Sequence, residues 1–174
     1  MNVLGHSNAV ERLRDNIRTV FPDDAFLGSV TPVDRISEKV YDDVLGLDVE
    51  LYDDQQALYG SLHRRRWSEI PASFINSNPD GIVLLTNETF VAFLPAWLTC
   101  ALTDKQVRDF MVYTFSPEPD KPSERMDSRM LLLTSQQKKA LLAFLAHCVE
   151  VESSKFIKEH ARTALAYVDQ STQP

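Results

Sequence analysis

The sequence predicts a mostly α-helical fold, a single domain of about seven helices with room for one very short β-hairpin. Apolar residues recur at helical spacing along most of the 174 residues, and threonine, serine and proline stand where helices commonly begin. The length and the 44% hydrophobic content are sufficient for one sizeable core. We expect residues 1–170 to form this domain and residues 171–174 to form a frayed polar tail.

Residues 86–102 are the most apolar helical segment and are predicted to form the central helix. Their apolar side chains recur at i, i+3, i+4, i+7 and i+8, the stripe that a helix buries against a core. Pro95 has no amide hydrogen for the Val91 carbonyl, so we expect either one kinked helix or two shorter ones. The stripe consists of Phe90, Phe93, Leu94, Trp97, Leu98, Ala101 and Leu102.

Three helices are predicted before the central one. The first runs from a Ser7 cap to about Phe21, and the second runs from a Thr31 cap to Gly46. The third covers about residues 49–63. The polar face of the first helix carries Glu11, Arg12, Arg14, Asp15 and Arg18.

Around and after the central helix, five segments have distinct signals. Residues 82–85 are expected to form a short buried strand or an extended lead-in. Residues 103–106 and 134–137 both read Thr-x-x-Gln, the pattern of a capping box that opens a helix. The polar, proline-containing segment 116–128 is predicted to be an exposed loop. A last helix follows, with apolar residues from 156 to 168 along one side.

The charge balance restricts the kind of partner. Eighteen basic and twenty-five acidic residues give a net charge of -7, which repels phosphate backbones and suits a basic protein partner. Only five glycines are present, without a Gly-rich phosphate loop, so we expect no nucleotide or other cofactor. Cys100 and Cys148 are expected to be buried free thiols. Neither a signal peptide nor a membrane span is predicted, so we expect a cytoplasmic protein.

No catalytic or metal-binding motif is predicted. No two of the four histidines are three to five residues apart, which disfavours a local zinc site. One alternative is a small hydrolase or transferase whose site is assembled from distant residues, with Glu38, Asp42 and His160 as the first candidates. The other interpretation of His160 is a satisfied or half-exposed histidine on an apolar face.

Three acidic doublets are the candidates for partner binding. Neighbouring residues on a helix point in different directions, which favours solvated faces over a metal site. Exposed carboxylates of this kind steer a basic protein toward its docking surface. The predicted partner-binding residues are Asp23, Asp24, Asp42, Asp43, Asp53 and Asp54.

The concentrated basic patch is formed by Arg64, Arg65 and Arg66, next to Trp67. One interpretation is a phosphate contact, which would make the chain a nucleic-acid accessory protein. The other is a solvated helix end with a buried tryptophan and arginines paired to carboxylates. The acidic composition favours the second interpretation.

Several segments taken together resemble a bacterial family known only as a domain of unknown function. They span about residues 21–145, and the block Leu94-Pro95-Ala96-Trp97-Leu98 is the most specific. The resemblance implies a fold and a bacterial origin, with no activity or site residue to transfer. The segments are Phe21-Pro22-Asp23-Asp24, Glu38, Trp67, Leu85 to Phe90, Phe93 to Leu98, Leu133 to Gln137 and Leu141 to Leu145.

The sequence therefore favours a non-enzymatic protein-binding module. More concretely, we expect a cytoplasmic bacterial immunity protein that neutralises a cognate toxin, encoded nearby, by blocking its active site. Small size, acidity and the absence of catalytic motifs all favour this function, with acidic side chains entering a basic cleft. The dispersed enzyme site and the nucleic-acid accessory protein remain the alternatives.

Overall fold

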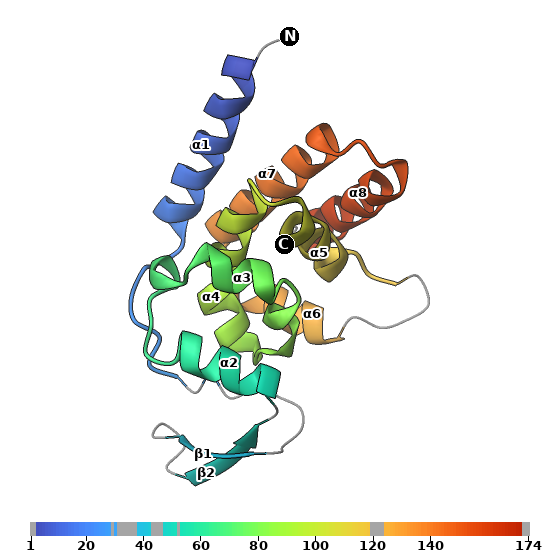
Figure 1. Cartoon of the computed structure of the whole chain (residues 1–174). Helices are drawn as coiled ribbons and strands as arrows, with labels where there is room; N and C mark the ends of the chain where they lie inside the picture. The colour runs from blue at the N-terminus through green and yellow to red at the C-terminus, as the bar shows by residue number, and fades with distance from the viewer. Residues whose placement is uncertain are drawn as a thin grey trace.

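The computed structural model describes residues 3–28, 30, 38–42, 47–51, 53–118 and 124–171. Within these residues lie eight α-helices, two short 3-10 helices and one two-stranded antiparallel sheet (Figure 1). The predicted mostly α-helical fold is confirmed, with eight α-helices among the described residues in place of about seven. The elements are α1 (Val3–Val20), β1 (Glu38–Asp42), β2 (Leu47–Leu51), α2 (Asp53–Leu62), η1 (Trp67–Glu69), α3 (Ala72–Ser77), η2 (Gly81–Leu84), α4 (Asn87–Ala101), α5 (Lys105–Phe115), α6 (Glu124–Leu132), α7 (Ser135–Val151) and α8 (Lys155–Gln170).

The predicted central helix is confirmed as α4. It packs against α1, α3, α5, α6, η1 and η2, and Phe93 and Trp97 on it are completely buried. Thr86 caps its N-terminus, because the Thr86 hydroxyl accepts a hydrogen bond from the Thr89 amide at 3.3 Å. Pro95 lies inside one continuous helix, so the alternative of two shorter helices is wrong.

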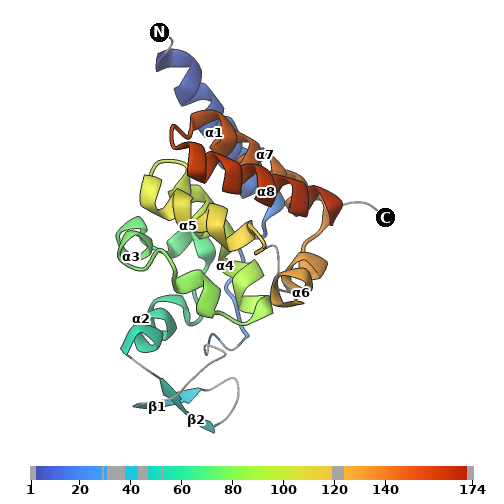
Figure 2. The same ribbon diagram turned by 90° about the vertical axis from the view of Figure 1, so that its right-hand side faces the viewer.

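The other long helices surround α4. Helices α7 and α8 pack against each other, α5 contacts both α4 and α8, and α1 contacts both α4 and α7. The predicted capping box at residues 134–137 is confirmed at the start of α7. Figures 1 and 2 show the two-stranded sheet at the end of the molecule opposite α7 and α8.

The second predicted helix, 31–46, is wrong where the structure describes it. Glu38–Asp42 forms β1, which pairs antiparallel with β2 so that Val40 lies opposite Val49. β-Branched side chains pack well across such a ladder, which favours the strand over the helix. The remainder of this segment lies outside the described residues. The third predicted helix also begins late, at Asp53, because β2 occupies residues 47–51.

Two predicted helix starts differ from the observed ones. Helix α1 begins at Val3, four residues before the expected Ser7 cap. Helix α5 is capped by Asp104, whose carboxylate accepts a hydrogen bond from the Val107 amide at 3.0 Å. Thr103, the expected cap, lies one residue too early. Both differences concern helix ends, where local sequence signals compete.

Two missed elements hold each other in place. Residues 81–84 form the 3-10 helix η2, neither a strand nor an extended lead-in, and α6 occupies the second half of the expected loop 116–128. Arg129 on α6 is 2% exposed and donates hydrogen bonds to the Val83 carbonyl at 3.1 Å and the Leu85 carbonyl at 2.8 Å. The guanidinium thus provides donors for one carbonyl of η2 and for the carbonyl of Leu85, the residue that follows it.

A buried carboxylate joins α5 to the junction between α7 and α8. Glu152 accepts hydrogen bonds from the Ser154 amide at 2.7 Å and from the Lys105 ammonium at 3.1 Å. Burial alone raises the pKa of Glu152, but these hydrogen bonds outweigh it, and the pKa lies below its ordinary value of 4.5. The junction is therefore stabilised by the ionised form of Glu152.

Replacing Glu152 with glutamine is expected to lower the free energy of unfolding at neutral pH by about 1–2 kcal/mol. A carboxyl whose pKa is lowered by folding stabilises the folded state at pH values above its ordinary pKa. That contribution is lost as the pH falls through the folded-state pKa. The difference between wild type and Glu152→Gln should therefore shrink below pH 4.5 in urea unfolding. Glu150→Gln, at an exposed position two residues away, is the control and should show neither effect. A pH-independent difference would contradict this role of the charge.

Candidate functional site

The described members of the six predicted partner-binding carboxylates are not all brought together. Asp43 lies outside the described residues, and Asp42, Asp53 and Asp54 are described by their backbone alone. In the β1–β2 ladder, Asp42 lies opposite Leu47, at the end of the sheet away from Asp53 and Asp54, which begin α2. The backbone therefore separates Asp42 from Asp53 and Asp54 along the sheet.

Asp23 and Asp24, the remaining doublet, have different environments. The Asp23 carboxylate accepts hydrogen bonds from the Ser68 amide at 3.2 Å and from the Ser68 hydroxyl at 2.6 Å. Asp23 thus connects the loop after α1 to η1, and its carboxylate is already engaged in hydrogen bonds within the protein. Asp24 is exposed and lines a groove beside that loop.

We call this feature the loop groove; it has a volume of about 560 Å³. Its walls come from the loop 21–28, from α4, and from the region where α6 ends and α7 begins. Leu27 and Leu132 line it with 67% and 46% of their surfaces exposed. Asp24 and Glu88 add two exposed carboxylates, and neither forms an ion pair with a residue that the structure describes. No lysine or arginine is among the described lining residues.

The loop wall of the groove is fixed by contacts distant in sequence. The Phe26 amide donates to the Arg65 carbonyl at 3.0 Å, and the Phe26 ring packs edge-on against Phe93, with centroids 5.8 Å apart. The Trp67 indole donates to the Pro22 carbonyl at 3.0 Å. A wall held at three points loses little conformational freedom when a partner binds.

A known protein family matches most of the chain. One family, described as a family of unknown function (DUF6714), matches residues 11–171. The chain belongs to this family. The predicted resemblance to a family of unknown function is thereby confirmed, and the DUF6714 match includes every residue of the loop groove. No curated protein and no solved structure matches the chain.

The three residues predicted as first candidates for a dispersed enzyme site are not brought together in this DUF6714 chain. Glu38 and Asp42 lie on β1, whereas His160 lies on α8 at the opposite end of the molecule (Figures 1 and 2). His160 is half-buried, and its Nδ1 lies 3.0 Å from the Ser116 hydroxyl oxygen. The interpretation of His160 as a satisfied, half-exposed histidine is confirmed.

The two cysteines are free and buried, as predicted. Burial, and secondarily the negative charge of Asp104, raises the pKa of Cys100 to about 11. Burial also raises the pKa of Cys148 to about 12. Both thiols are protonated at neutral pH, so neither is a ready nucleophile. Within the part of the chain that the structure describes, no three His, Cys, Asp or Glu side chains are grouped to hold a metal.

The basic cluster follows the end of α2. Arg64, Arg65 and Arg66 are exposed, and Trp67 beside them is buried, as expected for a solvated helix end. Glu69 accepts a hydrogen bond from the Arg66 amide at 2.9 Å and closes the turn into η1. The cluster therefore contributes to the turn between α2 and η1.

Among the described helices, none is both long and apolar enough to cross a membrane.

Proposed function

We propose that this protein is a non-enzymatic binding module whose loop groove receives a basic segment of a partner protein. The observation that carries the proposal is the lining of the groove. It combines exposed leucines with two carboxylates that form no ion pair with a described residue, and it contains no described basic residue. The net charge of -7 has the same sign and would steer a basic partner toward the surface. The partner that we propose is a cognate toxin, encoded nearby in a bacterium and blocked at its active site in the cytoplasm.

The chemistry of the groove suits a lysine or arginine side chain of the partner. The aliphatic stem of such a residue packs along apolar surface while its charged head reaches polar groups. In the groove, Leu27 and Leu132 supply the apolar surface, and Asp24 and Glu88 supply the acceptors. When the partner covers the groove, the contacts between its basic side chain and the carboxylates become buried. Burial would lower the local dielectric constant and strengthen the interaction.

The test is binding of the purified products of neighbouring genes, measured by isothermal titration calorimetry at two salt concentrations. Wild type should bind one basic protein tightly, and more weakly at high salt. The double variant Asp24→Asn/Glu88→Gln should lose at least about 2 kcal/mol of binding free energy, about thirtyfold in Kd. Growth of cells that express the toxin should be rescued by wild type and not by this variant.

The matched control is Asp15→Asn/Glu150→Gln, which removes the same charge from exposed positions outside the groove. This control should retain binding. It reduces only the long-range electrostatic attraction of the protein for a basic partner and leaves the groove unchanged. Equal weakening by the two double variants would reject the groove as the docking surface. Failure of every neighbouring product to bind would reject the immunity function itself.

A further inference from the structure

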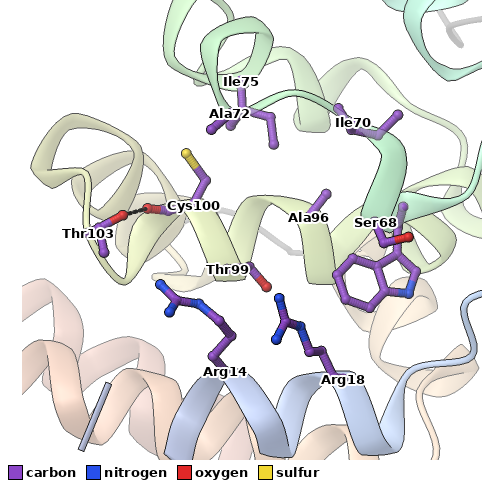
Figure 3. A pocket seen from close by; sticks show the side chains of 11 residues that line it. Arg14, Arg18, Ser68, Ile70, Ala72, Ile75, Ala96, Thr99, Cys100 and Thr103 are labelled. Carbon is purple, nitrogen blue, oxygen red and sulfur yellow. Dashed lines mark hydrogen bonds between the residues drawn. The ribbon is translucent and has the colours of Figure 1, made fainter. Parts of the chain in front are cut away.

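A second recess lies between α1, η1, α3 and α4, and two arginines face it. Arg14 and Arg18 are four residues apart on α1, so they project from the same side of the helix. Figure 3 shows both guanidinium groups reaching from α1 toward Thr99 on α4. The pocket that they line has a volume of about 220 Å³. The fold thus brings two positive groups to one cavity.

Thr99 supplies a third polar group in the same place. Its hydroxyl oxygen is buried and has no hydrogen-bond partner among the residues that the structure describes. In Figure 3 this hydroxyl points toward α1, on the side of the Arg18 guanidinium group. A buried hydroxyl without a hydrogen-bond partner has a free-energy cost. A ligand that forms a hydrogen bond with it removes that cost and gains binding free energy.

The charge of this pocket is opposite to that of the protein as a whole. None of its described lining residues is an aspartate or a glutamate, although the chain carries a net charge of -7. Arg18 forms no hydrogen bond or ion pair with any residue that the structure describes. Arg14 pairs with Glu11 on its own helix, and Glu11 is mostly exposed. A guanidinium held only by a surface carboxylate is easily recruited by a ligand.

The opposite wall of the pocket is apolar. Ile70, Ile75 and Ala96 line it, and the Cys100 thiol beside them donates a hydrogen bond to the Asn76 side chain at 2.9 Å. A volume of about 220 Å³ lies below the usual range for drug-sized ligands and above that of a cavity that holds benzene. The ligand that fits is therefore small, with one charged end and one apolar end.

We propose that this pocket binds a small oxyanion-bearing molecule, a carboxylate or phosphate with a short aliphatic body. The two guanidinium groups would bind the oxyanion through paired hydrogen bonds, a geometry that arginine provides and lysine does not. The Thr99 hydroxyl would donate a further hydrogen bond, and the aliphatic body would lie against the isoleucines. This site is independent of the loop groove, because the two share no lining residue.

The experiment is an NMR titration of the isotope-labelled protein with inorganic phosphate, acetate and hexanoate at constant ionic strength. We expect saturable chemical-shift changes at the backbone amides around Thr99. The relative affinities for phosphate and for the two carboxylates show which kind of oxyanion the pocket prefers. Hexanoate should bind more tightly than acetate, because its chain buries apolar surface. The variant Arg14→Gln/Arg18→Gln should raise the Kd at least about tenfold. Arg12→Gln, at an exposed position on the same helix, should leave the Kd unchanged.

Thr99→Val distinguishes ligand binding from a purely structural role of these residues. Valine has a similar shape but no unpaired hydroxyl, so this variant should raise the Tm of the free protein while weakening oxyanion binding. A raised Tm with an unchanged Kd would overturn the role assigned to Thr99. The absence of saturable shifts with all three anions would overturn the site, as would equal effects of Arg12→Gln and the double variant. None of these outcomes depends on whether a protein partner binds the loop groove.

Discussion

Replacing Trp97 with alanine is expected to lower the free energy of unfolding by about 3–5 kcal/mol. Trp97 on α4 is 0% exposed, and its ring packs edge-on against Phe74, with centroids 6.5 Å apart. Its indole also donates a hydrogen bond to the Pro79 carbonyl at 3.1 Å. The truncation therefore leaves both a cavity and an unpaired buried carbonyl. Urea unfolding followed by circular dichroism measures the loss.

Two further variants separate the contributions in this prediction. Trp97→Phe keeps a smaller aromatic ring and loses the hydrogen bond to Pro79, so an intermediate loss of about 1–2 kcal/mol is expected. Phe156→Ala removes an aromatic ring that is 65% exposed and should change stability by about 0.5 kcal/mol or less. If Trp97→Ala were as mild as Phe156→Ala, α4 would not be the centre of the core.

The best-predicted elements are those whose signals are local and agree with one another. In α4, the apolar stripe and the Thr86 cap specify the same helix, and tertiary packing does not oppose them. In α7, Thr134 and Gln137 form the predicted capping box directly before an apolar face. Where periodicity and capping chemistry coincide, the sequence alone is sufficient to predict the element.

A very short hairpin was allowed for in the predicted fold, but its position was missed, because its residues also satisfy a helical pattern. The cap signals at Thr31 and the spacing of Val40 favoured a helix over residues 31–46. The stronger signal lay in the partner strand, where Leu47, Val49 and Leu51 alternate with acidic residues at the period of a strand. A strand is stabilised by its neighbour across the ladder, so a single segment read by itself gives an ambiguous answer.

The two candidate sites were the least predictable features. Asp24 was found from its sequence as part of an acidic doublet, but the loop groove also needs Glu88 and Leu132, which are distant along the chain. Arg14 and Arg18 were predicted only as part of a polar helix face. Their position opposite Thr99 depends on how α1 packs against α4, which helical periodicity does not determine.

Replacing Arg129 with alanine is expected to lower the free energy of unfolding by about 3–5 kcal/mol. Its guanidinium carbon lies 4.0 Å from the centroid of the Phe90 ring, and its hydrogen bonds satisfy two carbonyls of the η2 region. Burial, and secondarily the charge of Arg125, lowers the pKa of Arg129 to about 9, so burying this charge has a cost. The contacts offset that cost. Truncation leaves the Val83 carbonyl without its donor, reduces the Leu85 carbonyl to its bond from Arg125, and removes the contact with Phe90, so the net effect of the variant is destabilising.

Arg125→Ala is the matched control for this prediction. Arg125 is exposed and donates to the Leu85 carbonyl at 3.0 Å, but that carbonyl keeps its bond from Arg129 when Arg125 is removed. The control should therefore lose about 1 kcal/mol or less in urea unfolding. Arg129→Lys should lie between the two, because one ammonium replaces a planar group that spans both carbonyls. If Arg129→Ala and Arg125→Ala had equal effects, the α6–η2 contact would be maintained by apolar packing instead of by the buried guanidinium.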